Sequence, residues 1–175
     1  MKLKSATVWW LVARGLLALH ALFAFIAWFN LPERIPTHFG MGGEADAWSG
    51  RSLWTWFMFV AISLGFHLLF SLLILPGALR FWNIPEKERF LRLTPEQQRP
   101  VVELKRSFAG AATVCLTVVM LALQIGIYLT AQGHTKGLPW YIQIALFGPA
   151  IGLVIGVFFW MNAMERVIVK ASSSE

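Results

Sequence analysis

Four long uncharged stretches constrain the fold of this 175-residue chain more than any other feature. No Asp, Glu, Lys or Arg occurs over residues 15–32, 52–79, 107–135 or 137–164. A bilayer core about 30 Å thick needs about 20 mostly apolar residues per helix. A chain this short could not shield four helices that are apolar on every face from water. We therefore predict an all-α membrane protein whose four transmembrane helices form an antiparallel bundle.

The composition agrees with this class of protein. Hydrophobic residues make up 57% of the chain and charged residues 14%, whereas roughly a quarter of the residues of a soluble domain are charged. The predicted spans, within a single membrane domain covering 1–175, are about 7–30, 53–75, 108–131 and 140–162. They leave an outer loop at 31–52, an amphipathic inner loop at 76–107 and a short outer turn at 132–139.

The distribution of Lys and Arg predicts the orientation, because cytoplasmic loops carry an excess of these residues. Three of them, Arg34, Arg51 and Lys136, fall on one side of the spans. Eleven fall on the other side: Lys2, Lys4, Arg80, Lys87, Arg89, Arg92, Arg99, Lys105, Arg106, Arg166 and Lys170. Both termini are therefore predicted in the cytoplasm of a bacterium, with the protein in the cytoplasmic membrane. Since the basic residues flank the spans, we expect the lipid bilayer as partner and no nucleic acid.

Arg14 lies inside the first predicted span. An arginine near the end of a span can extend its guanidinium to the headgroups, and Trp9 and Trp10 are typical interface residues. The lipid-embedded part of this span is therefore expected to begin near Gly15.

Three glycines spaced by four, Gly148, Gly152 and Gly156, form one small-residue stripe on the last span. Such a stripe lets helix backbones approach closely in lipid. The partner is another span of this chain, which we favour, or a second copy. Pro149 removes one backbone donor and is expected to kink the helix.

The inner loop contains two alternative helix starts. Thr94 followed by Pro95 and, three residues after the cap, Gln97 is typical of a helix N-terminus; Pro100 then interrupts that helix or begins a second one. The preceding segment mixes basic residues with Phe81, Trp82, Ile84, Phe90, Leu91 and Leu93. It either lies on the inner membrane surface or is an ordinary connecting loop.

The outer loop is predicted to be folded. Its prolines stiffen the first half, and its glycines permit a tight turn with positive φ. Phe39 and Trp48 could return toward the bilayer surface. We expect ligand-binding residues here: Pro32, Pro36, His38, Phe39, Gly43, Glu44, Asp46 and Trp48.

A metal site is the second interpretation of this loop. His38, Glu44 and Asp46 offer one nitrogen and two carboxylates, which a divalent ion could use, although their spacing matches no established metal signature. Alternatively, His38 and Asp46 form hydrogen bonds that hold the turn. No nucleotide-binding or hydrolase motif occurs in the sequence. We therefore favour a protein without catalytic residues or a cofactor.

Two histidines, His20 and His67, lie within predicted spans. Ionisable residues in the bilayer usually face the protein interior. The two could cooperate in proton transfer or ligate haem. We favour neutral imidazoles bonded to a neighbouring helix, with Gln124 and Thr113 as possible partners.

Several dipeptides of the outer loop recur together in one bacterial family. They are Leu31-Pro32, Ile35-Pro36, His38-Phe39 and Gly43-Glu44, followed by Asp46 and Trp48. The segment resembles a membrane domain of unknown function that is also found in SdpI-type immunity proteins, with Gly40 and Ala45 where asparagine and proline are common. Residues 82–91 resemble the second landmark of that family. The resemblance implies protection against a secreted peptide and signalling across the membrane.

Three functions follow from these features. The leading hypothesis is a non-enzymatic sensor or immunity-type protein that binds a ligand or peptide at the outer loop, with the inner loop contacting the membrane or a cytoplasmic protein. The second is a small metal-binding membrane enzyme. The third is an accessory subunit of a membrane complex, or a homo-oligomer, held by the glycine stripe.

Overall fold

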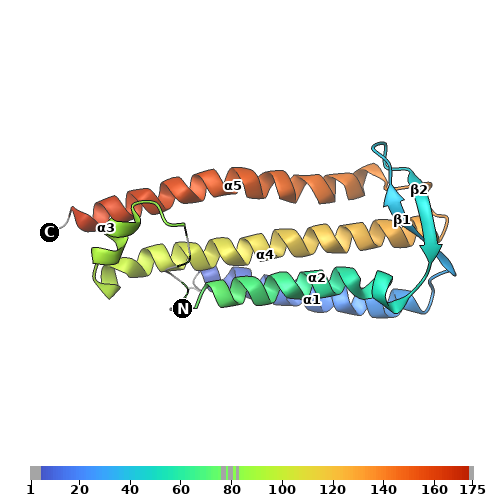
Figure 1. Cartoon of the computed structure of the whole chain (residues 1–175), viewed down its shortest axis with the longest axis horizontal. Coiled ribbons are helices and arrows are strands. Elements are labelled where there is room, and N and C mark those ends of the chain that lie inside the picture. Colours follow the sequence, from blue (N-terminus) through green and yellow to red (C-terminus); the bar gives the residue numbers. More distant parts are fainter. Residues whose placement is uncertain (1–4, 76–77, 79–80, 82, 174–175) are drawn as a thin grey trace.

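The computed structural model describes residues 5–75, 78, 81 and 83–173. Five helices and one β-hairpin occur in this part of the chain (Figure 1). Their order is α1 (Ser5–Trp28), β1 (Arg34–Phe39), β2 (Ala45–Gly50), α2 (Leu53–Leu73), α3 (Lys87–Arg92), α4 (Pro95–Ala131) and α5 (Trp140–Ser172).

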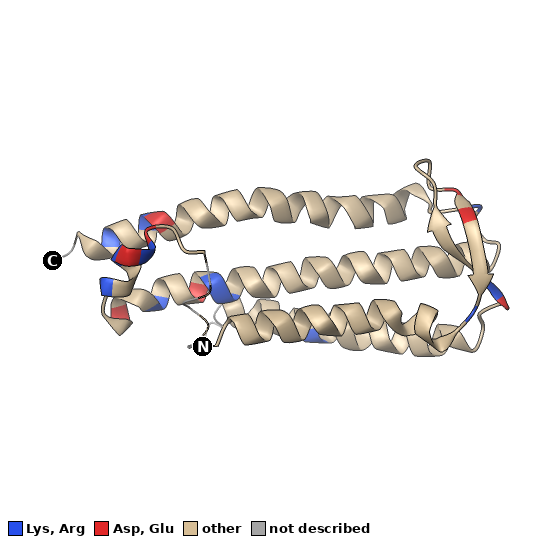
Figure 2. Ribbon diagram, viewed as in Figure 1, with Lys and Arg blue, Asp and Glu red and all other residues tan. Residues whose placement is uncertain are grey.

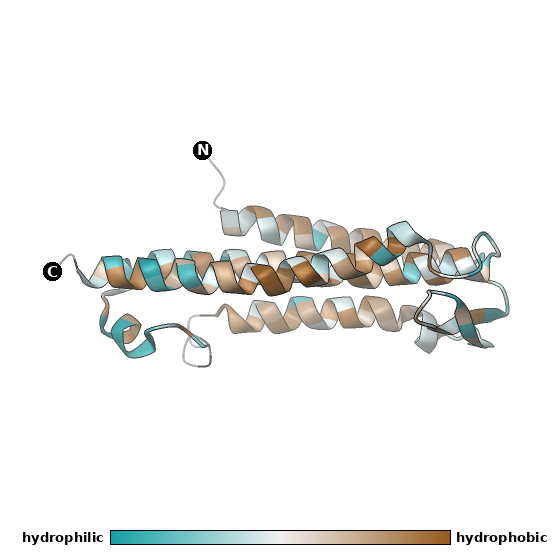
Figure 3. Ribbon diagram, turned by 90° about the horizontal axis from the view of Figure 1, so that it is seen from above, coloured by the Kyte–Doolittle hydropathy of each residue, from teal (hydrophilic) through white to brown (hydrophobic). Residues whose placement is uncertain are grey.

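Four of these helices, α1, α2, α4 and α5, are long and apolar enough to cross a membrane. Figure 3 shows hydrophobic residues along their middle parts and hydrophilic residues mainly at the two ends of the molecule. Together these helices identify a multi-pass membrane protein. α1 and α2 agree with the predicted spans within about two residues. α4 and α5 continue well past their predicted spans at the end where the chain starts and finishes.

α4 is the central helix and contacts α1, α2 and α5. α1 and α4 approach closely because small residues line their contact: Ala6 and Ala13 are buried on α1, and Ala109 and Gly110 on α4. A Cβ at Gly110 would come within 2.8 Å of Trp9 Cβ. Small residues of this kind permit close helix packing in lipid.

α5 packs along α4, away from α1 and α2 (Figure 1). Its buried residues lie only near its two ends: Ile142, Met164 and Ile168. The stripe of Gly148, Gly152 and Gly156 borders open space, since a Cβ at any of the three would meet nothing within 4 Å. Packing of this stripe against another span of the same chain is therefore a wrong prediction for the described residues; packing against a second copy stays a prediction.

An apolar cluster forms where α3 meets the start of α4 and the end of α5. The buried residues of this inner cluster are Ile84, Phe90, Leu93, Val101, Met164 and Ile168. Phe81 and Leu91 of the same segment are exposed, and Trp82 lies outside the described residues. Half of the apolar side chains expected at a membrane surface or in a plain loop thus pack against protein instead.

A capping box starts α4. Thr94 N donates to Gln97 Oε1 over 2.9 Å, and Gln97 N donates to Thr94 Oγ1 over 3.4 Å. The helix continues through Pro100 without a break. The start at Thr94 is therefore correct, and the interruption or second start at Pro100 is wrong. Pro100 is the sixth residue of the helix, so it deprives the Glu96 carbonyl of its helical donor. Both residues are exposed, so water can bond that carbonyl instead.

Candidate functional site

The loop between α1 and α2 forms a β-hairpin, which was not predicted from the sequence. β1 and β2 pair antiparallel from Arg34 opposite Gly50 to Phe39 opposite Ala45, with an irregularity around His38. Pro36 cannot donate to a ladder, but a two-stranded sheet has an edge where no donor is needed. Gly43 adopts φ +86° in the turn, a conformation that glycine reaches without strain.

His38 and Asp46 meet across the hairpin. Their Nδ1 and Oδ1 atoms lie 2.6 Å apart, and both side chains are largely exposed. An exposed pair of this kind adds about 0–1 kcal/mol. Glu44 bends over the turn instead of joining the pair, since a Cβ at Gly40 would lie 2.9 Å from Glu44 Oε1. Glycine at position 40 is thus what makes room for this carboxylate.

No group of three or more His, Cys, Asp or Glu side chains among the described residues is placed to hold a metal ion. The three residues considered for a metal site divide into the bonded pair of His38 and Asp46 and a separate Glu44. The arrangement therefore offers acid–base partners at the surface and no enclosed coordination shell.

The tip of the hairpin is docked onto the loop between α4 and α5. Leu138 N donates to Gly43 O over 2.7 Å, and Glu44 and Gly137 form a β-bridge. Only glycine fits at position 137, because a Cβ there would collide with Gly43 O. On α5, Gln143 Nε2 donates to Leu138 O over 2.9 Å. The start of α5 is thus tied to the hairpin.

The base of the hairpin is sealed onto the ends of the helices. Arg51 donates from Nη1 to Leu31 O over 2.6 Å, and its guanidinium lies 5.3 Å from the centre of the Trp28 ring. Leu31 and Ile35 are buried with Trp56 in one apolar cluster that joins α1, α2 and α4. The hairpin is thus attached at two places, at its base to α1, α2 and α4 and at its tip to the loop before α5.

An apolar cavity of about 250 Å³ lies beneath β1. It is lined by Ile35, Pro36, Thr37, Thr55, Met58, Phe59 and Ile127. Pro36 was predicted as a binding residue. The lining residues of α2 and α4 were missed, because an apolar side chain facing a cavity has the same sequence signal as one facing lipid.

The remaining predicted residues do not line this cavity. Pro32 and Phe39 are half-buried, and Gly43 is buried at the docked tip. Trp48 pairs with Pro36 across the strands and keeps 39% of its surface exposed. Met41, at the tip, is fully exposed.

A buried polar network lies inside the membrane-spanning part. His20 of α1 contacts Ser63 Oγ of α2 at 3.1 Å and Gln124 Oε1 of α4 at 2.7 Å. Gln124 Nε2 donates to Trp56 O over 2.7 Å. The amide nitrogen is thus occupied, and the oxygen must accept from His20 Nε2–H. Neutral His20 then accepts the Ser63 hydroxyl at Nδ1.

His20 and His67 do not bond each other directly. His67 Nδ1 lies 3.2 Å from Ser63 O, so Ser63 connects the two imidazoles through its hydroxyl and its carbonyl. Gln124 is the partner that was expected for a histidine, whereas Thr113 bonds Ala109 O on its own helix.

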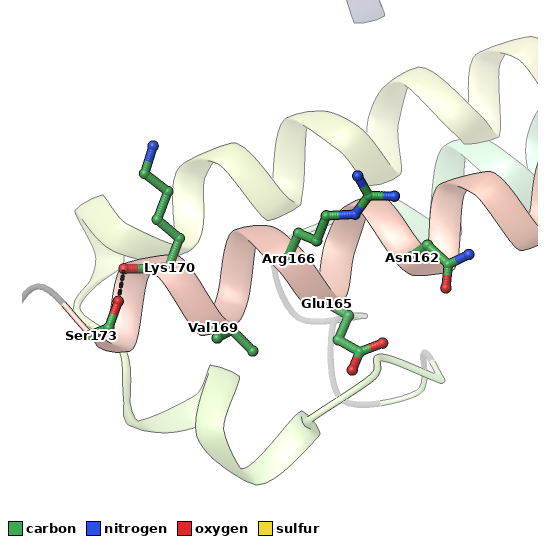
Figure 4. A pocket seen from close by; sticks show the side chains of 6 residues that line it. All are labelled: Asn162, Glu165, Arg166, Val169, Lys170 and Ser173. Carbon is green, nitrogen blue, oxygen red and sulfur yellow. Dashed lines mark hydrogen bonds between the residues drawn. The ribbon is translucent and has the colours of Figure 1, made fainter.

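A cavity of about 530 Å³ lies at the other end of the molecule. Figure 4 shows that its lining side chains come from the last turns of α5 and from Ser173, which follows the helix. Since one helix alone forms this surface, it has no opposing wall that could orient a ligand.

Residues 15–64 match the model of a family described as "Domain of unknown function (DUF1648)". The match runs from α1 through the hairpin into α2. It includes the whole hairpin but only a minority of the chain. The family description names no activity. No curated protein and no solved structure matches the chain.

Proposed function

We propose that this protein is a non-enzymatic membrane receptor of the sensor or immunity type, which binds an apolar ligand or peptide segment at its hairpin. The observation that carries the proposal is the cavity beneath β1, closed by a hairpin that is held at both base and tip. Fixed walls favour binding, because little conformational entropy is lost when the ligand enters.

The proposed orientation puts the hairpin outside a bacterial cytoplasmic membrane, with α1, α2, α4 and α5 antiparallel and both termini inside. Lys and Arg gather at the end of the molecule that carries both termini, and few lie at the hairpin (Figure 2). The excess of cytoplasmic Lys and Arg in membrane proteins supports this assignment.

The lining of the cavity sets the chemistry of the ligand. Ile35, Met58 and Phe59 offer apolar surface, and Thr37 offers a hydroxyl. The hydroxyl of Thr55 is already bonded to Ser52 in the capping box of α2. The volume of about 250 Å³ suits one large apolar side chain or the end of an acyl chain, and the strands of the hairpin could pair with an extended peptide. The resemblance to SdpI-type immunity proteins favours a secreted peptide.

We propose that α5 transmits ligand binding from the hairpin to the inner cluster at the other end of the molecule. Its start is joined to the hairpin through the bond from Leu138 to Gly43, and its end contributes Met164 and Ile168 to the inner cluster. Between these ends it buries no residue. α5 packs along α4 but buries no polar side chain of its own. We therefore expect it to shift more easily than α1, α2 and α4, which the polar network cross-links.

The experiment uses a substitution that fills the cavity. Deleting the gene is expected to sensitise cells to a secreted antibacterial peptide, and the wild-type gene is expected to restore resistance. Met58→Trp should fail to restore it, as should Asp46→Ala and Trp48→Ala. Met41→Trp is the matched control, because Met41 is fully exposed at the tip and lines no cavity found here.

Membrane levels and melting temperatures of all variants are measured in parallel, so that loss of folding is separated from loss of binding. If deletion leaves sensitivity unchanged across a peptide panel, or if Met58→Trp and Met41→Trp restore resistance equally, the proposal is wrong.

A further inference from the structure

A cavity of about 380 Å³ opens between α1, α2 and α4 at the end opposite the hairpin. Its volume falls in the range of about 300–1,000 Å³ that is typical of small-molecule sites. The polar side chains lining it are Thr7 and Arg14 of α1, Ser71 of α2, and Glu103 and Arg106 of α4.

Two guanidinium groups, those of Arg14 and Arg106, face this cavity. Neither Arg14 nor Arg106 has a side-chain hydrogen bond or ion pair within the described part of the chain. Glu103 has an interaction of its own. The lining carries two positive charges and one negative charge, so it attracts an anion. Arginine is the residue that best holds phosphate oxygens, through two parallel N–H donors.

The position of the cavity matches the level of the lipid headgroups. Arg14 is the last charged residue before the uncharged stretch of α1, and Arg106 is the last before that of α4. Ser71 lies in the final turn of α2. Trp10 lines the cavity and donates from Nε1 to Arg106 O over 3.2 Å, and tryptophan is typical of the membrane interface.

The surface next to the cavity is apolar. Leu11 of α1 lines the cavity, and Leu68 and Leu72 lie on the same helix as Ser71; all three leucines keep more than half of their surface exposed. Acyl chains could therefore lie along α1 and α2 while a phosphate occupies the cavity. Basic pockets between transmembrane helices on the cytoplasmic side are known to bind anionic headgroups.

We propose that the cavity lined by Arg14, Arg106, Thr7 and Ser71 binds a phosphate anion, and that its source is the headgroup of an anionic phospholipid. This proposal concerns the opposite end of the molecule from the ligand site and is independent of it.

Native mass spectrometry tests the site with phosphatidylglycerol as the probe. The full-length protein is purified from nanodiscs of phosphatidylcholine with phosphatidylglycerol, and the retained anionic lipid is measured. Arg14→Gln and Arg106→Gln are each expected to lower retention about tenfold, since each removes a charge-assisted hydrogen bond. Arg166→Gln is the matched control, because it removes the same charge on α5 outside this cavity.

A second variant leaves the charges in place. Ser71→Leu fills part of the cavity and should also lower retention, whereas all variants should melt as the wild type does in pure phosphatidylcholine. Inorganic phosphate at millimolar concentration should not displace the lipid. If it does, the lipid source is wrong and the ligand is a soluble phosphate. Equal retention by all variants, or equal loss in Arg166→Gln, would overturn the site itself.

Discussion

The His20–Gln124 hydrogen bond should couple α1 to α4 energetically. In Gln124→Leu the buried Nε2–H of His20 loses its acceptor, and in His20→Leu the Gln124 carbonyl loses its donor. An unsatisfied buried group costs about 1–3 kcal/mol. The double variant replaces both groups by apolar side chains, so it should be destabilised by less than the sum of the two single variants.

The expected coupling follows from measurements on membrane helices. Interhelical hydrogen bonds there average about 0.6 kcal/mol and reach about 1.7 kcal/mol. The bond of 2.7 Å between His20 and Gln124 is short and fully buried, which places it toward the upper part of that range. We therefore expect a coupling free energy of about 1–1.7 kcal/mol.

The assay is reversible unfolding in mixed micelles with increasing sodium dodecyl sulfate, followed by tryptophan fluorescence. Thr117→Val combined with His20→Leu is the control pair, since Thr117 is equally buried on α4 but bonds Thr113 O on its own helix. That pair should be additive within about 0.3–0.5 kcal/mol. If the free energies of His20→Leu and Gln124→Leu also add within this error, the network does not join the helices as argued.

Three further predictions concern the two ends of the molecule. Gly43→Ala, at φ +86°, should cost about 1–3 kcal/mol of local stability and speed hydrogen exchange in the hairpin, whereas Gly50→Ala, with open surroundings, should not. Thr94→Ala should lose about 1 kcal/mol of capping energy and speed exchange in the first turn of α4, and Thr94→Ser should retain protection. Burial, together with the charge of Lys87, lowers the pKa of Lys105 to about 7. The unfolded chain then binds more protons between pH 7 and about 10.5, so stability should rise with pH there by up to about 1.4 kcal/mol per pH unit. This slope should vanish in Lys105→Met melts.

The boundaries of α1 and α2 could be predicted because each has a local cause. α2 begins at Leu53, directly after the Ser52 cap, and both helices end where the apolar stretch meets prolines or loop residues. α4 shows where local signals conflict. The capping box of Thr94 and Gln97 started the helix, and the local cost of Pro100 did not break it, because the long packed helix that follows outweighs the loss of one hydrogen bond at an exposed turn.

The hairpin and the inner cluster could not be predicted from local sequence. β1 buries two adjacent residues, Ile35 and Pro36, so it lacks the alternation that identifies a strand. In the inner cluster, Phe90 packs against Met164 and Ile168, which lie more than 70 residues away. A segment of mixed apolar and basic residues has the same pattern whether it covers a membrane surface or another helix. The contact that decides between the two is not local.

Two kinds of interhelical contact occur in the bundle, buried hydrogen bonds and mainly apolar packing. α1, α2 and α4 are joined by directional bonds: His20 to Gln124, Gln124 to Trp56 O, and Trp56 Nε1 to Ala24 O. Such a network resists sliding, because a shift of one residue along a helix would leave several buried groups unsatisfied. α5 instead packs along α4 mainly through apolar contacts such as the stack of Phe108 and Trp160. Two hydrogen bonds are added near its C-terminal part, from Trp160 to Leu104 O and from Gln97 to Ala171 O.

An aromatic stack tolerates small displacements, since its energy changes gradually with offset. In the proposed receptor, ligand binding would shift the tip of the hairpin together with the start of α5, while the base stays on the three cross-linked helices. In the inner cluster, the displacement would first change the packing of Met164 and Ile168 against α3 and the start of α4. α5 is buried near its ends and not in its middle. This arrangement fits the proposed role of carrying a shift from one face of the membrane to the other.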